Sequence, residues 1–244
     1  MNTLGFLFVL IFLGLIVLFT FLSHKDPVFP ARELQAFTIL RRSIGRAVEA
    51  GTRLHISLGQ EPLTGPHGAV ALAGLEALDR VTQSTGIGDQ PPLATAGEGS
   101  LAILAQDELH NAARDQEVEY DPTAGRVTGL TPFSYAAGVL PVIEDEKLEA
   151  NLLIGSFGSE IALITAAGDR TGIPTIAGTD DLPGLAALYV SVDEPLIGEE
   201  AFSSGAYLNG GPAYMGSLRA QDVLRWVIII LILLGALLKL GGLL

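Results

Sequence analysis

Two hydrophobic runs, one at each end of the chain, constrain the fold more than any other feature. The first reads LGFLFVLIFLGLIVLFTFL at residues 4–22 and holds no charged residue. A helix of this length is about 28 Å long, enough to cross the hydrocarbon core of a bilayer. The second reads WVIIILILLGALLKLGGLL at residues 226–244, interrupted only by Lys239, which is close enough to the helix end to reach the interface. We therefore expect a transmembrane helix within residues 1–23 and another within residues 219–244.

A cleaved signal peptide and a buried core helix are the alternatives for these two runs. Against the signal peptide, no Lys or Arg precedes the first run, and no convincing small-x-small cleavage site follows it. Against the core helix, residues 227–234 are all bulky aliphatics and leave no polar face. Trp226 also suits an interfacial anchor. These observations favour a transmembrane helix in each run.

Charge divides the chain into basic ends and an acidic middle. Residues 1–59 carry +3, residues 60–218 carry −18 and residues 219–244 carry +2, which together give the net charge of −13. Such an acidic body repels nucleic acid, so no nucleic-acid partner is expected. Basic residues flank the body side of the two runs: Lys25, Arg32, Arg41, Arg42, Arg219 and Arg225. Since only Lys239 lies on the other side, the positive-inside rule predicts a cytoplasmic body with both termini outside.

A juxtamembrane segment, residues 24–53, joins the first span to the body. Within it Leu34, Phe37, Leu40 and Ile44 recur at helical spacing and predict an amphipathic helix. This connecting helix either packs its apolar face on the body or lies on anionic lipid headgroups through its arginines.

The body, residues 54–218, alternates short apolar runs with longer helical patterns. In the first half, residues 54–115, the strand-like runs are LHISLG and PPLATAG; in the second half, residues 151–207, they are NLLIGSFG and IPTIAG. Each half reads as strand, glycine turn, helix and a proline-led strand that ends in Ala-Gly. Because strands that alternate with helices favour parallel pairing, we predict an α/β fold whose parallel sheet comes from a duplicated β-α-β-α unit. Chance similarity between two ordinary βαβα segments is the alternative.

The insertion between the halves, residues 116–150, is too long and too apolar for a flexible linker. It carries Tyr120, Phe133 and Tyr135 among prolines and glycines. We expect it to pack across the sheet or to reach a neighbouring subunit.

Four unusual strings occur in order along the body: TGLTPFSYAAGVLPV (128–142), NLLIGSFGSEIALIT (151–165), DEPLIGEEAF (193–202) and GAYLNGGPAYMGSLRAQDVLRW (205–226). Together they resemble an uncharacterised family of prokaryotic two-span membrane proteins, a domain of unknown function. The resemblance covers most of the chain, from about Leu54 to Trp226. It implies no activity and no site residue, since the family has no assigned catalytic residues.

Ligands of parallel α/β sheets bind beyond the carboxyl ends of the strands, where helix N-termini offer N–H groups. One glycine turn at such an end spans residues 59–67. The residues of three further turns are candidates for ligand binding: Gly97, Glu98, Gly99 and Ser100; Gly155, Ser156, Gly158 and Ser159; Gly178, Thr179, Asp180 and Asp181. The same residues also suit helix caps and tight turns without any ligand. Because none of the turns fits G-x-G-x-x-G or the P-loop, no cofactor is expected.

Catalytic and metal-binding patterns are weak. Cysteine is absent, which excludes thiolate chemistry. Glu98 could form a carboxylate metal site with Asp180 and Asp181 if the two halves converge, but solvated capping residues explain the same positions, so no metal is predicted. No G-x-S-x-G motif of a hydrolase nucleophile occurs.

Two classes of function stay open. The first is a non-enzymatic, membrane-anchored scaffold that forms a homo-oligomer or binds a membrane-protein partner. Small residues in the second run would permit close helix contacts in lipid: Gly235, Ala236, Gly241 and Gly242. The second is a ligand-binding or sensory domain, or an enzyme, that uses the glycine turns. The missing motifs favour the scaffold.

Overall fold

The computed structural model describes residues 3–25, 33–86, 90–208 and 211–241. The chain forms two compact units. One consists of the terminal segments, residues 1–33 and 210–244, and the other is the body, residues 34–209.

The terminal unit pairs the two apolar helices, α1 (Thr3–Lys25) and α9 (Pro212–Leu240). Both are long and apolar enough to cross a membrane, as predicted. The helices approach closely where Gly216 faces Thr20, since a Cβ on Gly216 would lie 2.7 Å from the Thr20 nitrogen. Beside this contact Arg219 donates a hydrogen bond of 2.8 Å to the Ser23 hydroxyl. A small residue therefore permits the pairing of α1 and α9.

The body is built on a sheet of five parallel strands among the described residues, which confirms the predicted α/β class. The strands are β1 (Arg53–Gly59), β2 (Leu93–Ala96), β3 (Gly125–Val127), β4 (Leu148–Ser156) and β5 (Thr175–Gly178). Their order is β3-β2-β1-β4-β5, with every neighbouring pair parallel. The central strands β1 and β4 are buried along most of their length, as expected for a sheet covered on both faces.

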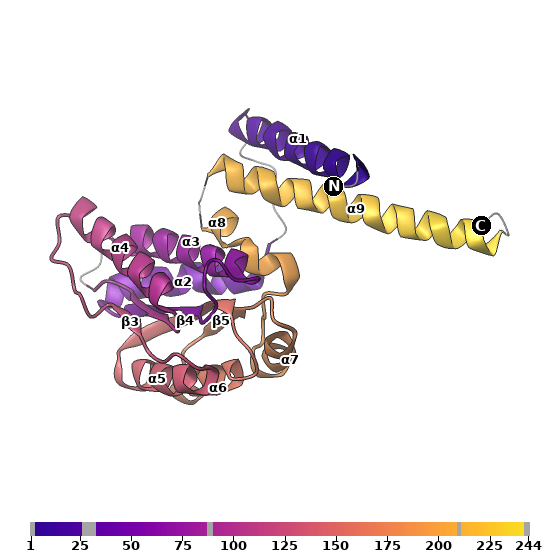
Figure 1. Ribbon diagram of the computed structural model, residues 1–244. Helices are drawn as coiled ribbons and strands as arrows, with labels where there is room; N and C mark the ends of the chain where they lie inside the picture. The colour runs from indigo at the N-terminus through magenta and orange to yellow at the C-terminus, as the bar shows by residue number, and fades with distance from the viewer. Residues whose placement is uncertain (1–2, 26–32, 87–89, 209–210, 242–244) are drawn as a thin grey trace. The chain divides into compact units, whose positions relative to one another are not determined.

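Helices cover the two faces of the sheet (Figure 1). One face carries α2 (Gln35–Ala50), α3 (Gly68–Thr85), α4 (Gly99–Asp115) and the short α8 (Ser204–Tyr207). The other face carries α5 (Pro132–Asp145), α6 (Ile161–Thr171) and α7 (Leu182–Ser191). A 3₁₀ helix, η1 (Gly198–Phe202), follows α7.

The two halves of the body are arranged around the central pair of strands. The first runs β1-α3-β2-α4 and the second runs β4-α6-β5-α7, and each steps outward from the centre to its own side. Their helices lie on opposite faces (Figure 1). This is the layout of doubly wound α/β folds, with the strand order reversing between β1 and β4. Two copies of a β-α-β-α unit would give the same layout; the duplication itself stays a prediction. The insertion contributes β3 and α5, which carry the chain across to β4.

Helix α2 packs on the body. Phe37 and Leu40 are fully buried in the core, whereas Arg41 and Arg42 are exposed. Of the two arrangements considered for the connecting helix, the structure shows the packed one. The preceding residues 26–32 lie outside the described part of the chain.

Buried polar side chains of β1, β2, β4 and α5 are hydrogen-bonded to one another in the core. His55 Nδ1 lies 2.6 Å from Asn151 Oδ1, and His55 Nε2 lies 2.9 Å from Thr95 Oγ1. The Tyr135 hydroxyl of α5 lies 2.5 Å from Ser57 Oγ and 3.2 Å from Thr95 Oγ1. These bonds tie the crossover helix α5 to β1 and β2, and they tie β1 to β4. Burial lowers the pKa of His55 to about 4 and raises the pKa of Tyr135 to about 12.

Candidate functional site

The predicted turns lie at the carboxyl edge of the sheet, and the two central turns are in contact. Gly59 has φ +78°, and a Cβ there would lie 2.5 Å from the carbonyl oxygen of Ser156. The same oxygen accepts a hydrogen bond of 3.3 Å from the Gln60 backbone. Glycine is therefore required at position 59 by the contact between β1 and β4. Protein backbone bridges the crevice where doubly wound folds bind their ligands.

A carboxylate of the chain itself takes the hydrogen-bond donors of the turn after β4. The Gly158 N–H donates to Glu160 Oε1 at 2.8 Å, and Gln60 Nε2 donates to the same oxygen at 3.0 Å. Glu160 is 4% exposed. A phosphate or carboxylate ligand would have to displace this buried side chain before it could reach the N-terminus of α6. Of the predicted residues, Gly155 and Ser156 belong to β4, and the exposed Ser159 follows Gly158.

In the turn after β2, a carboxylate of the chain itself again accepts the hydrogen bonds that the turn offers. Glu98 is the N-cap of α4, where its side chain accepts hydrogen bonds from the Leu101 N–H at 3.0 Å and from the Ser100 hydroxyl. The Ser100 hydrogen bond, followed by those from backbone N–H groups, holds the pKa of Glu98 below its usual range. Gly99 begins α4, and the space beside Gly97 is filled by neighbouring side chains. Glu98 thus acts as a helix cap.

The turn after β5 carries the one imidazole–carboxylate contact found at this edge among the described residues. Asp180 Oδ2 lies 2.9 Å from His67 Nδ1, and this hydrogen bond raises the pKa of His67. Thr179 is buried and ties the β4 and β5 ends together, because its hydroxyl oxygen accepts a hydrogen bond of 3.0 Å from the Phe157 N–H. Gly178 ends β5, and Asp181 precedes α7 as its N-cap without a side-chain capping bond.

The carboxylates described at the carboxyl edge are spread along the sheet and disfavour anions. Strands β2 and β5 are three positions apart in the sheet, about 14 Å, so Glu98 does not converge with Asp180 and Asp181. Within the described ranges no group of three or more His, Asp or Glu side chains is placed to hold a metal ion. Among the described residues, the edge therefore combines carboxylates with turns whose donors are already hydrogen-bonded, which disfavours a phosphate.

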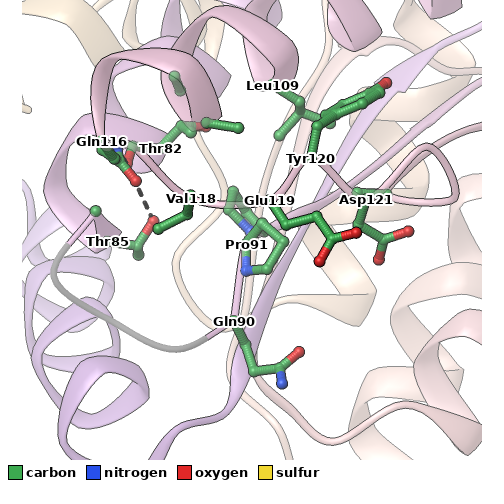
Figure 2. A pocket seen from close by; sticks show the side chains of 15 residues that line it. Thr82, Thr85, Gln90, Pro91, Leu109, Gln116, Val118, Glu119, Tyr120 and Asp121 are labelled. Carbon is green, nitrogen blue, oxygen red and sulfur yellow. Dashed lines mark hydrogen bonds between the residues drawn. The ribbon is translucent and has the colours of Figure 1, made fainter.

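A pocket of about 370 Å³ lies at the opposite, amino-terminal edge of the sheet. Figure 2 shows Thr82, Thr85 and Gln116 on one side of it, and Glu119, Tyr120 and Asp121 on the other. The volume is within the range of small-molecule sites. The last turns of α3 and α4 contribute to the lining, so two helix C-termini with partial negative charge border the pocket.

The polar groups of this pocket are only partly satisfied. Asp121 is compensated, because Thr123 and Arg53 both donate to it, and these contacts lower its pKa. Glu119 has no ion pair and the Tyr120 hydroxyl has no hydrogen bond among the residues that the structure describes. The Tyr120 ring packs on His110 with ring centroids 5.0 Å apart, and burial raises the pKa of Tyr120. The pocket would accept an amine more readily than an anion.

Helix α7 presents an apolar face to solvent. None of its ten residues is charged, and the exposed ones follow helical spacing: Leu182, Pro183, Ala186, Tyr189 and Val190. Leu182 is 78% exposed, Tyr189 is 75% exposed and Val190 is 87% exposed. We call this face the α7 surface. Clustered apolar groups of this kind on a soluble domain mark interaction sites more often than isolated exposed residues do.

A family model described as a domain of unknown function, DUF6754, matches residues 1–242. The chain belongs to this family. No curated protein and no solved structure gives a significant match. Membership of DUF6754 therefore supplies no site residues, and a function can be inferred only from the geometry of the chain.

Two features of this DUF6754 member were missed in the sequence. The run LPGLAALYVS signals an apolar helix, but the same letters suit a fully buried helix, so its exposure was not predicted. The amino-terminal pocket draws on α3, α4 and the segment before β3, whose proximity depends on the strand order.

Proposed function

We propose that this DUF6754 member is a two-span membrane protein whose acidic α/β body is a non-enzymatic assembly module, with the α7 surface as its binding face. The α7 surface is the observation that carries the proposal. Burying a large apolar side chain on association contributes about 1.5–3 kcal/mol, and three such side chains are exposed there, Leu182, Tyr189 and Val190. A fold that already buries a continuous core has no internal use for an uncharged, exposed helix face.

The closed carboxyl edge supports assembly over catalysis. Glu98 and Glu160 occupy the backbone donors that a phosphate or acyl oxyanion would need. An enzyme that bound a phosphate or an acyl oxyanion at this edge would need those donors open.

The partner in this proposal is another protein, either a second copy in a homo-oligomer or a different membrane protein. The repulsion between two bodies of charge −18 (residues 60–218) weighs against direct contact between bodies of two copies at low ionic strength. It does not act on contacts between spans, where small residues of α9 that do not face α1, such as Gly235, allow close packing.

The proposed orientation places the body in the cytoplasm and both termini outside. The support is the basic residues on the body side of the apolar runs, among them Arg41, Arg42, Arg219 and Arg225. Reporter domains fused to the C-terminus and inserted in an exposed body loop test it: activity of a cytoplasmic reporter at the body and of an external reporter at the C-terminus is expected.

Photo-cross-linking tests the binding face. A photoreactive phenylalanine replaces Tyr189 in the full chain, and the matched control replaces Ile103, an exposed apolar residue of α4 that is 67% exposed. We expect a discrete adduct in native membranes from position 189 and none from position 103, with the purified chain showing whether the adduct is a homodimer. Equal adducts from both positions, or none from either, would contradict an α7 binding face.

Small-molecule binding in the amino-terminal pocket is a second candidate function, favoured by the Glu119 carboxylate and the Tyr120 hydroxyl, which have no partner among the described residues. Binding to the native state raises the melting temperature. A screen of small amines against carboxylates of the same size should give shifts with amines alone, and Glu119→Gln should abolish them. Shifts that survive Glu119→Gln would place the ligand elsewhere.

A further inference from the structure

A groove of about 500 Å³ adjoins the C-terminal end of the α7 surface. It is lined by the last turn of α6, the start of β5, the end of α7 with the residues that follow it, and the first turn of α2, and it includes Asp169, Thr175, Ser191, Asp193 and Glu194. A second depression shares Asp169, Ser191 and Asp193 with it and is also lined by Tyr189 and Val190 of the α7 surface. The groove and the apolar face are therefore one continuous surface.

The groove is acidic, and its carboxylates have no cation within the described residues. Asp169, Asp193 and Glu194 are exposed and take part in no ion pair there, whereas the nearby Arg170 is engaged by Glu144 at 2.6 Å. Within the described part of the chain, none of the three carboxylates is therefore paired with a positive side chain.

Two of the three helix ends at the groove, the C-termini of α6 and α7, repel these carboxylates; the third is the N-terminus of α2, whose Ala36 and Ile39 also line the groove. Asp169 lies in the last turn of α6, and Asp193 and Glu194 follow the C-terminus of α7. Helix C-termini carry a partial negative charge, so acidic side chains there are unfavourable and a cation is favourable. An external cation would remove this repulsion at both helix ends at once.

A guanidinium suits the three carboxylates of the groove, because it keeps its positive charge at every physiological pH and carries five N–H donors in a planar fork.

We propose that the α7 surface and the acidic groove together bind a protein segment in which an apolar stripe lies next to an arginine, with the guanidinium in the groove. This deepens the proposed assembly function and rests on it, since it names the chemistry of the partner at the same surface. Anionic lipid headgroups are disfavoured by the three carboxylates, and a second body of the same acidic charge is disfavoured for the same reason.

Two synthetic helical peptides with the same apolar stripe, one flanked by arginines and the other by glutamates, test the proposal. Binding is measured by fluorescence anisotropy on the full chain in nanodiscs of zwitterionic lipid, with empty nanodiscs as the blank. We expect the arginine peptide to bind with an affinity that falls as salt is added, and the glutamate peptide to bind at least about tenfold more weakly.

The decisive variant neutralises the groove: Asp169→Asn, Asp193→Asn and Glu194→Gln. Its matched control makes the same change in net charge at exposed positions elsewhere: Asp107→Asn, Asp115→Asn and Glu117→Gln. The groove variant should lose about tenfold or more in affinity for the arginine peptide, and the control should lose little. Melting temperatures close to that of the parent chain verify that both variants fold.

Equal losses in the two variants would reduce the effect to overall charge and overturn the inference. Equal binding of the two peptides, or binding to empty nanodiscs alone, would also overturn it. The assembly function would survive each of these results as long as cross-linking at position 189 persists. If the cross-link from Tyr189 is absent while the arginine peptide still binds through the groove, the proposed assembly function is contradicted and arginine binding in the groove is supported.

Discussion

Acidification should destabilise the body through one buried imidazole, His55. In the fold His55 is fully buried, its Nδ1 lies 2.6 Å from Asn151 Oδ1, and its pKa is lowered from 6.5 to about 4. The unfolded chain binds a proton at this side chain below pH 6.5, whereas the folded chain binds it only near pH 4. Stability from neutral His55 is therefore complete above pH 6.5 and falls as the pH decreases from 6.5 towards 4.

The size of the effect follows from the lowered pKa of His55. At 1.36 kcal/mol for each pKa unit, the full loss near pH 4 is about 3 kcal/mol, and about 2 kcal/mol is lost between pH 7 and pH 5. The interval between pH 7 and pH 5 separates the effect of His55 from that of the carboxylates, because most carboxylates titrate below pH 5. Urea unfolding of the full chain in nanodiscs, followed by far-UV circular dichroism at pH 7, 6 and 5, measures it.

Two variants separate His55 from the other titrating groups. His55→Gln should flatten the dependence of the free energy of unfolding on pH between pH 7 and pH 5. His67→Gln should steepen it, because the pKa of His67 is raised by Asp180 and its protonation stabilises the fold as the pH falls. If His55→Gln does not fold, labelled-histidine NMR of the parent chain replaces it, with a neutral imidazole expected at pH 5. A parent slope equal to that of folded His55→Gln, or a protonated His55 at pH 5 in the native state, would refute the reasoning.

Three substitutions test the packing described above. Gly59→Ala should cost about 1–3 kcal/mol in urea unfolding, because φ is +78° and the new methyl meets backbone, whereas Gly45→Ala on the open face of α2 should cost nothing. Tyr135→Phe should cost about 1–3 kcal/mol in the same assay, since the polar groups bonded to its hydroxyl stay buried and lose that partner. Gly216→Leu should separate α1 from α9, because a side chain there meets Thr20; after proteolytic removal of the body the two helices should no longer co-purify.

The sequence predicted the elements and the sheet type because each depends on local periodicity. Alternation of short apolar runs with helical patterns is enough to favour parallel strands, and the charge-free run at residues 4–22 is enough to favour a span-length helix. The turns after the strands were located for the same reason. Strand β3 has only three residues and carries little pattern, so the insertion 116–150 was expected either to pack across the sheet or to reach a neighbouring subunit, and was not resolved into β3 and α5.

The state of the predicted ligand edge could not be derived from local pattern. Whether the turn after β4 is open depends on Gln60 and Glu160, which are 100 positions apart in the chain and meet because β1 and β4 are neighbours. Strand order is a long-range property that no single segment encodes. The buried bonds between His55, Asn151 and Thr95 also depend on which strands flank β1.

The acidic residues of the body fall into two electrostatic classes, and the difference indicates where function should be sought. Glu98 and Glu160 lie at helix N-termini, where a carboxylate accepts backbone N–H bonds and stabilises the fold. Asp169 and Asp193 lie at helix C-termini, where a carboxylate is repelled and no described cation pairs with it. The first class is explained by folding alone. The second opposes folding, and residues that break a local rule without a compensating contact concentrate at functional sites. The carboxylates of the second class adjoin the exposed apolar face of α7. For this reason we place the binding function at this end of the body and not at the carboxyl edge.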